Sequence, residues 1–220
     1  MNIGIIGSGA REHALCYKLK QSRSVKKIFC IPGNAGTSEI CENLEVDLNN
    51  FEELYKVVIS KKIDLLVIGP EIPLVNGITD FFEEKKIKVF GPSKSASQLE
   101  GSKAFMKKIC KEFSIPSAKY EFVNKIEQVE DVINKFNLPI VVKSDGLAAG
   151  KGVSICKSKK EAINDIKSIL NGKFKTSKNV IVEEFLDGEE VSYFVITDGE
   201  NSIAEKKMID LYKFKLVGII

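Results

Sequence analysis

The sequence lacks most of the features that mark nucleic-acid, membrane and zinc proteins. Its 33 basic residues nearly balance 30 acidic ones, so the net charge of +3 gives no strong field to attract nucleic acid or an anionic membrane. No apolar run approaches the length of a membrane span. The five cysteines are widely spaced and include no Cys-x-x-Cys pair, which argues against zinc and predicts reduced thiols in a cytoplasmic protein.

The sequence also has few arginines, and its first residues do not have the pattern of a targeting signal. Arg11 and Arg23 are the only arginines, so Arg11 stands out where it lies in a motif. The first residues carry no basic lead and soon become glycine-rich, which predicts a strand rather than a signal peptide. The length of 220 residues and the apolar fraction of 44% allow a real core in one large or two modest domains.

The first part of the chain alternates strands and helices, which is typical of an α/β fold with an open parallel sheet. Helices are expected to begin near Arg11, Phe51 and Gly77. The expected strands are Ile3–Ile6, Lys27–Ile31, Leu65–Ile68 and Val89–Phe90. We therefore predict a Rossmann-like N-terminal domain over residues 1–92, followed by a helical linker over 93–117 that breaks at Gly101.

The second part has the pattern of an α+β module, predicted over residues 118–199. Two helices are expected over 126–136 and 160–170, packed on one antiparallel sheet. The expected strands are Tyr120–Val123, Ile140–Lys143, Val153–Cys156, Val180–Glu184 and Glu190–Thr197, with a hairpin turn at Asp198-Gly199. The tail, 200–220, ends on an apolar run that would leave an unpaired strand edge, so we expect a truncated or aberrant end, or a partner that covers it.

A glycine-rich loop after the Ile140 strand predicts a flexible cover for a polyphosphate. Gly146, Gly150 and Gly152 let the backbone approach a ligand, while Lys143 and Lys151 supply compact positive charges. The Walker motif does not fit, because Asp145 replaces its first glycine and Gly152 replaces the hydroxyl residue that follows the lysine. The loop also leads into a strand, so it is a hairpin. The alternative is a plain β-turn with Lys151 in water.

Three further loops are expected at the carboxyl ends of the parallel strands, the edge at which open α/β sheets bind ligands. The first loop, with Gly7, Gly9 and Arg11, opens a helix and predicts a phosphate site. It does not fit NAD, because a third glycine is replaced by Glu12. The other two loops carry Asn34 and Glu71. Each of the three loops, taken singly, also fits an ordinary turn.

The second module carries its own candidate nucleotide residues. Lys103 opens a helix, and the segment from Glu183 through Glu184 to Leu186 links two strands, where it offers an apolar slot and backbone groups to a purine ring. Glu190 is placed to accept from ribose hydroxyls. The alternative for this acidic run is a solvated turn.

Six motifs in order, from Gly7 to Glu190, resemble the phosphoribosylamine–glycine ligase (glycinamide ribonucleotide synthetase) family of ATP-grasp enzymes. They are Gly-Ser-Gly-Ala-Arg-Glu-His-Ala, Pro-Gly-Asn-Ala-Gly-Thr, Gly-Pro-Glu-x-Pro-Leu, Gln-Leu-Glu-Gly-Ser-Lys-Ala-Phe, Lys-x-Asp-Gly-Leu-Ala-Ala-Gly-Lys-Gly-Val and Glu-Glu-Phe-Leu-Asp-Gly-Glu-Glu. The resemblance implies a ligase of purine synthesis that uses ATP, glycine and phosphoribosylamine, with Mg²⁺ or Mn²⁺ expected for the full-length family member.

The resemblance also implies roles for the candidate residues. Lys103, Lys143, Lys151 and the loop from Gly146 through Gly150 to Gly152 would bind the ATP phosphates, Glu183, Glu184 and Leu186 would frame adenine, and Glu190 would bind ribose. Gly7, Gly9, Arg11, Asn34 and Glu71 would hold phosphoribosylamine. Small molecules are therefore the expected partners, and the oligomeric state is left open.

The match to the family stops near Gly199, before its metal ligands and the rest of its ATP-grasp fold. We therefore expect an incomplete ATP-grasp domain, no metal site in this chain and no turnover by the chain alone. Two other functions stay open at this point. One is a non-catalytic fragment that binds nucleotide or a partner protein, and the other is an ATP-grasp ligase with a different substrate, against which the Arg11-Glu12-His13 turn speaks.

Overall fold

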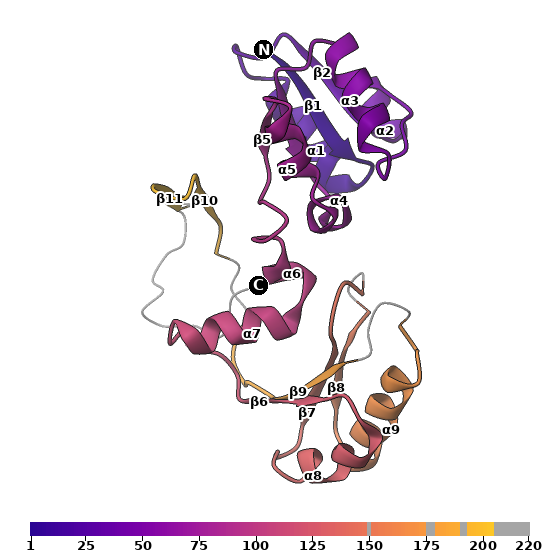
Figure 1. Ribbon diagram of the computed structural model, residues 1–220, viewed down its shortest axis with the longest axis vertical. Coiled ribbons are helices and arrows are strands. Elements are labelled where there is room, and N and C mark those ends of the chain that lie inside the picture. Colours follow the sequence, from indigo (N-terminus) through magenta and orange to yellow (C-terminus); the bar gives the residue numbers. More distant parts are fainter. Residues whose placement is uncertain (149–150, 175–178, 190–192, 205–220) are drawn as a thin grey trace. The chain divides into compact units, whose positions relative to one another are not determined.

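The computed structural model describes residues 1–148, 151–174, 179–189 and 193–204. The chain forms two compact units, Met1–Gly101 and Ser102–Ile220, each drawn with its own elements in Figure 1. The predicted linker contributes to both units, because it holds one short helix before Gly101 and a longer one after it.

The first unit is built on a five-stranded parallel sheet with the order β3-β2-β1-β4-β5. Its strands are β1 (Asn2–Gly7), β2 (Lys27–Pro32), β3 (Glu42–Asn43), β4 (Leu65–Ile68) and β5 (Lys88–Phe90). The central strand β1 pairs Ile5 with Cys30 on one side and with Val67 on the other. The prediction of an open parallel sheet is confirmed.

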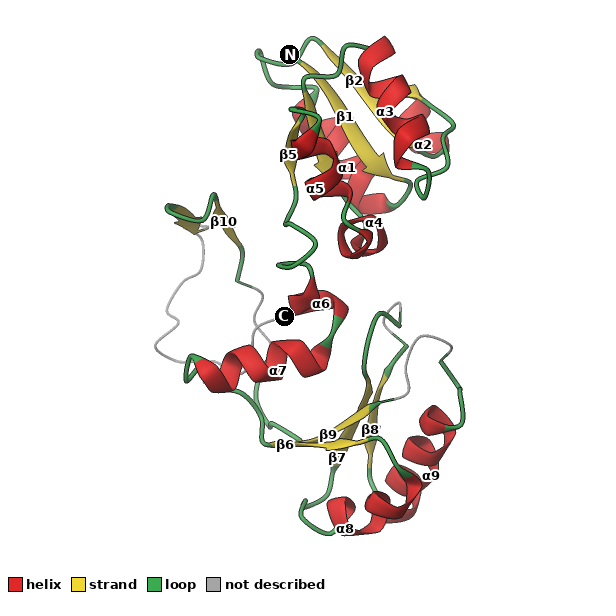
Figure 2. Ribbon diagram, in the orientation of Figure 1, coloured by secondary structure: helices red, strands yellow, loops and turns green. Residues whose placement is uncertain are grey.

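Helices cover both faces of this sheet (Figure 2). They are α1 (Ala10–Leu19), α2 (Ala35–Ser38), α3 (Phe51–Ser60), α4 (Glu71–Asn76), α5 (Ile78–Glu84) and α6 (Gln98–Gly101). Leu54 of α3 and Phe82 of α5 are buried against Ile6 and Leu66, whereas Cys16 of α1 is buried against Ile5 on the opposite face. Because both faces are covered, β1 is apolar at nearly every position.

The second unit is built on a four-stranded antiparallel sheet with the order β6-β9-β7-β8. Its elements are α7 (Lys103–Glu112), β6 (Tyr120–Val123), a 3₁₀ turn (Ile126–Gln128), α8 (Val129–Ile133), β7 (Ile140–Ser144), β8 (Val153–Cys156), α9 (Lys159–Leu170) and β9 (Val180–Glu184). Figure 1 shows α8 and α9 together on one face of this sheet. The α+β prediction is confirmed for the described residues.

The alternation of side chains along the strands puts different residues on the two faces of this sheet. Val142 of β7 and Val182 of β9 are fully buried in the core that also contains Ile166 of α9. Their neighbours Lys143 and Glu183 point to the other face, since successive side chains of a strand point to opposite sides. Helices α8 and α9 thus bury one face, and the other face carries Lys143 and Glu183 beside the buried apolar side chains of Val141 and Ile181.

Several element boundaries differ from the expectation. The loop after β4 is helical from Glu71, because Pro73 lies in the first turn, where a proline is tolerated. The helix expected over 126–136 is α-helical only over α8, and Pro139 disfavours helix in the residue before it. Strand β3 was not expected.

The last described elements form a hairpin. Strand β10 (Val195–Thr197) pairs antiparallel with β11 (Ser202–Ala204), and Asp198 N–H donates to Asn201 O, which confirms the turn at Asp198-Gly199. The strand expected from Glu190 begins only at Val195, and residues 190–192 lie outside the described part. Of the helices in the described ranges, none combines the length and the apolar character needed to cross a membrane.

The core of the second unit predicts a large difference between two isoleucines. Ile166 is fully buried under the sheet, whereas Ile155 on β8 is 52% exposed on the opposite face. We expect Ile166→Ala to lower the free energy of unfolding by about 2–5 kcal/mol through lost burial and a cavity. The matched control Ile155→Ala should cost under about 1 kcal/mol in the same urea titration, and equal costs would contradict the described burial.

Candidate functional site

The first two loops of the parallel sheet are joined by hydrogen bonds. Asn34 Nδ2 donates to Ser8 O at 2.9 Å and to Gly9 O at 3.3 Å, and Gly33 N–H donates to Gly7 O at 3.1 Å. The Asn34 side chain also caps α2, accepting from Thr37 N–H. The structure thus brings Gly7, Gly9 and Asn34 together, as their place at the carboxyl ends of neighbouring strands predicts.

Glu12 explains why the first loop departs from the dinucleotide pattern. Its buried carboxylate accepts a hydrogen bond from Gly9 N–H at 2.6 Å through Oε2. A Cβ atom at Gly69 would lie 2.0 Å from Glu12 Oε1, and one at Gly7 would lie 2.7 Å from the Glu12 side chain. The third glycine of the dinucleotide pattern allows close packing of helix and strand, and here that space is filled by the Glu12 side chain, which fixes the loop.

Arg11 and Glu71 connect the first loop to the third. Arg11 Nη2 lies 2.9 Å from Glu71 Oε1, and both side chains are exposed, by 69% and 41%. Burial raises the pKa of Glu71, but the hydrogen bond from its own backbone N–H and the ion pair with Arg11 outweigh it, so this pKa lies below its usual value. The five candidate residues of the first unit therefore line one edge of the sheet.

In the second unit, Asp145 ties the glycine loop to the start of α7. Its carboxylate accepts from Ser102 Oγ at 3.3 Å, Ala104 N–H at 3.2 Å and Gly146 N–H at 3.0 Å. Lys103 Nζ donates to Gly146 O at 3.1 Å. The loop and Lys103 are thus parts of one hydrogen-bonded unit, with Lys103 beside the glycine loop.

The loop itself is the turn of a β-hairpin, as predicted. Ser144 N–H donates to Gly152 O at 2.8 Å, and β7 continues antiparallel into β8. Gly146 has a positive φ of 85°, a conformation that favours glycine. Lys151 is exposed on the loop, and Gly150 lies outside the described residues.

Lys143 and Glu183 meet on the sheet face opposite the helices. Lys143 Nζ lies 2.8 Å from Glu183 Oε2, and Lys107 Nζ of α7 lies 3.1 Å from Glu183 Oε1. The side chains of Lys107 and Glu183 are 3% and 4% exposed, whereas that of Lys143 is 27% exposed. Two lysines therefore share one buried carboxylate.

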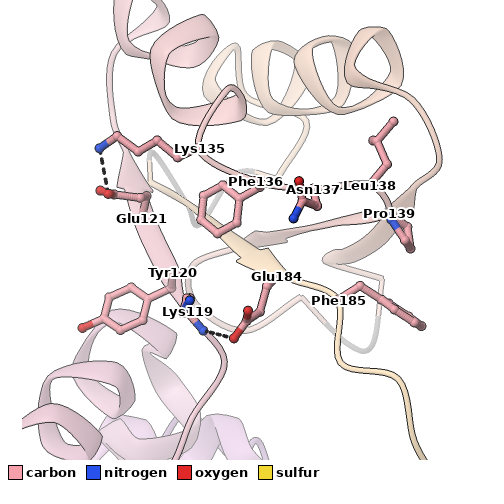
Figure 3. A pocket seen from close by; sticks show the side chains of 10 residues that line it. All are labelled: Lys119, Tyr120, Glu121, Lys135, Phe136, Asn137, Leu138, Pro139, Glu184 and Phe185. Carbon is pink, nitrogen blue, oxygen red and sulfur yellow. Dashed lines mark hydrogen bonds and ion pairs between the residues drawn. The ribbon is translucent and has the colours of Figure 1, made fainter.

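Glu184 points away from this cluster. Its carboxylate accepts from Lys119 N–H at 2.8 Å and lines a cavity of about 380 Å³ on the helix side, with Phe136 and Phe185 (Figure 3). The side chains of Glu183 and Glu184 thus lie on different faces, and the Glu184 carboxylate takes no part in the Lys143 cluster. Leu186 is partly exposed after the strand, and Glu190 lies outside the described residues.

Three residues that organise these sites were not among the sequence candidates. Glu12 and Asp145 drew attention only as residues that break known motifs, yet each accepts the hydrogen bonds that hold its loop. Lys107 follows Lys103 by four residues and precedes Cys110 by three, so helical periodicity places it on the inner face of α7. A lysine on the face of a helix that periodicity predicts to be buried was the sequence signal that could have identified Lys107.

Comparison with known proteins gives two family matches that together span most of the chain. Residues 1–100 match the family model described as phosphoribosylglycinamide synthetase, N domain. Residues 101–215 match the one described as phosphoribosylglycinamide synthetase, ATP-grasp (A) domain.

Similar proteins carry a consistent name. The chain is 47% identical over 204 residues to phosphoribosylamine–glycine ligase of Clostridium acetobutylicum, covering 91% of this chain and 49% of that protein. The corresponding Haemophilus influenzae ligase is 45% identical over 205 residues, covering 91% and 48%. The crystal structure of the Thermotoga maritima ligase matches with a TM-score of 0.77 and 32% identity, covering 93% and 49%. The chain spans about half the length of the curated relatives it matches.

The packing of Glu12 predicts that position 69 tolerates only glycine. We expect Gly69→Ala to displace Glu12 from Gly9 and to lower the free energy of unfolding by about 1–3 kcal/mol. Gly188→Ala is the control, because a Cβ there meets nothing within 4 Å. Glu12→Ala in the Gly69→Ala background removes the clash, so the methyl group at position 69 should then cost less; an unchanged cost would refute the contact.

The Arg11–Glu71 pair predicts a change in one titration. We expect Arg11→Gln to raise the pKa of Glu71 towards its usual value, about 4.3, as followed by carboxyl NMR. Because the folded-state pKa is lowered, the pair stabilises the fold above the unfolded pKa, and this contribution is lost as the pH falls through the folded pKa. Arg23→Gln, which removes an exposed arginine elsewhere, should leave the Glu71 titration unchanged.

Proposed function

Because the chain belongs to the phosphoribosylglycinamide synthetase family, we propose that it is the part of an ATP-dependent carbon–nitrogen ligase that binds ATP and phosphoribosylamine. In this proposal the complete protein joins glycine to phosphoribosylamine in purine synthesis. The observation that carries the proposal is the contact of Lys103 with the glycine loop, together with Lys143 on the strand that leads into this loop.

The second unit supplies the charge and flexibility that a triphosphate needs. Lys103 holds its ammonium group beside the loop, Lys143 lies on the strand that leads into the loop, and exposed Lys151 is carried by the loop itself. The described loop glycines, Gly146 and Gly152, leave backbone amides free of bulky side chains. In this assignment the face carrying Lys143 and Glu183, with the backbone from Glu184 to Leu186, receives the adenine ring. Gly150 and Glu190 keep their proposed roles from the resemblance.

The first unit offers a site for a phosphorylated sugar. The loops of Gly7, Asn34 and Glu71 lie together at the carboxyl edge, and the first opens α1, whose N-terminal amides favour an anion. Arg11 adds a cation at this edge, and Glu71 and Asn34 offer groups that hydrogen bond to hydroxyls or an amine. We assign phosphoribosylamine to this edge.

The proposed chemistry requires positioning and charge neutralisation rather than proton transfer by the protein. The glycine carboxylate attacks the γ-phosphate of ATP to give glycyl phosphate and ADP, and the sugar amine then attacks the carbonyl carbon and releases phosphate. The lysines neutralise the negative charge on the transferring phosphoryl group. A divalent cation is expected in the full-length family member. The described residues contain no group of three or more His, Cys, Asp or Glu side chains that fits a metal ion, so we assign no metal ligand here.

The cellular setting in this proposal is the cytoplasm, where all five cysteines would remain the free thiols that the structure shows. The alternative function is a fragment that binds nucleotide without turnover. This alternative shares the nucleotide site of the main proposal, but it forms no glycinamide ribonucleotide.

Nucleotide binding predicts a thermal stabilisation that depends on the loop. ATP at 100 times its dissociation constant should stabilise the chain by about 2.7 kcal/mol. Lys151→Met, which loses one phosphate contact, should weaken affinity about tenfold and reduce this gain to about 1.4 kcal/mol at the same ATP concentration. The control Lys160→Met changes an exposed lysine of α9 and should keep the full shift; no shift for the unmodified chain would refute the ATP site.

The prediction that the 220-residue chain alone does not turn over is tested by incubating it with ATP, Mg²⁺, glycine and phosphoribosylamine. We expect no glycinamide ribonucleotide by mass spectrometry, while the Haemophilus influenzae ligase, as positive control, forms it. Product from the chain alone would contradict the prediction and exclude the non-catalytic alternative.

A further inference from the structure

The cluster of Lys107, Glu183 and Lys143 carries one positive charge more than its carboxylate can neutralise. One lysine neutralises one carboxylate, and buried Lys107 alone could do so for Glu183, which leaves the partly exposed Lys143 in excess. The additional cation therefore points to an anion that is part of the working site.

The two lysines are held in different ways. Lys107 is buried, and besides Glu183 it donates to Ser117 Oγ and, at 3.2 Å, to Ala118 O, with its ammonium 5.2 Å from the ring centre of Tyr120. Lys143 is partly exposed, and within the described ranges Glu183 is its one ion-pair partner. Lys107 is thus fixed by several neighbours, whereas Lys143, within the described ranges, has one ion pair to give up.

If Lys143 were the sole partner of Glu183, moving it would leave a buried carboxylate without a counter-charge, which is strongly destabilising. The contacts of Lys107 with Ser117 and Ala118 do not involve Lys143, and its Nζ, which lies 3.1 Å from Glu183 Oε1, supplies a second counter-charge. This contact is an ion pair without hydrogen-bond geometry to Oε1, but charge compensation depends on distance rather than on direction.

We propose that Lys107 is a positioning residue for Lys143: it keeps Glu183 compensated, so that Lys143 can exchange this carboxylate for an oxygen of a bound polyphosphate. The proposal rests on the proposed function, because the polyphosphate is that of the nucleotide. Lys107 itself touches no ligand.

The reactivity of the Lys143 amine tests the exchange without any ligand. The protein is treated with limiting acetic anhydride, and the acetylation of Lys143 is followed by site-resolved mass spectrometry. We expect Lys143 to react about tenfold more slowly in Lys107→Met, because Glu183 then has no second cation and attracts the Lys143 ammonium more strongly. Lys107→Gln gives the same expectation should the apolar variant not fold. The matched control is Lys108→Met, which removes an exposed charge from the same helix and should leave the Lys143 rate within twofold.

A double-mutant cycle shows whether Lys107 acts through Glu183. In the Glu183→Gln background the neutral amide needs no counter-charge, so adding Lys107→Met should change the Lys143 rate less than twofold. A purely structural role of Lys107 would disturb both backgrounds alike. Equal Lys143 rates in the unmodified chain and Lys107→Met, or a tenfold effect that persists in Glu183→Gln, would overturn the proposal.

Inorganic tripolyphosphate, which carries no adenine, then separates the inference from the nucleotide assignment. We expect it to protect Lys143 from acetylation in the unmodified chain and in the double variant, and to protect it severalfold less in Lys107→Met. A third outcome is that the acetylation rates follow the expectation while tripolyphosphate protects Lys143 in no variant. This result would uphold the ion-pair coupling between the two lysines, but it would overturn both the exchange for polyphosphate and the proposed phosphate site.

Discussion

Three carboxylates, of which Glu12 and Glu183 are buried, fix the segments on which the proposed sites depend. Glu12 holds Gly9 from beneath the first loop, Asp145 holds the start of the glycine loop against α7, and Glu183 holds two lysines on the open sheet face. In each case the acid contacts backbone or ammonium groups that we propose to bind a ligand. The amides and ammonium groups are thereby positioned before any anion arrives.

In each unit, apolar packing and the charged groups occupy different parts of the sheet. Packing of α8 and α9 buries one face of the second sheet, and Lys143 and Glu183 lie on the other. In the first unit the helices cover both faces of the parallel sheet, so only its carboxyl edge remains for a ligand. Apolar periodicity thus decides where polar groups can gather, and the acids decide how they are oriented.

The sequence predicted the sheets well because their signals are local. Strands such as Leu65–Ile68 and Val180–Glu184 are apolar runs bounded by turn residues, and the structure has them with the expected limits. The meeting of the Gly7 and Asn34 loops also followed from parallel topology alone. Short elements such as β3 depend on pairing with another strand, so no local sequence pattern predicts them.

The partners of the charged residues were harder to predict, because they come from distant parts of the chain. Glu183 and Glu184 are adjacent in sequence and were given one role, but strand alternation places their side chains on different faces. Lys107 meets Glu183 across 76 residues of sequence, a pairing that only the fold defines. Family resemblance supplied the ligands of the site, and the structure supplied the interactions that position its residues.

The central claim, that the glycine loop and the face of Glu183 form a nucleotide site, is tested most directly by mapping ATP on the chain with amide NMR. The account predicts that ATP shifts the resonances of Lys103, Gly146, Gly152 and Glu184, while those of the α9 helix stay in place. Shifts confined to the first unit, or none at saturating ATP, would contradict it.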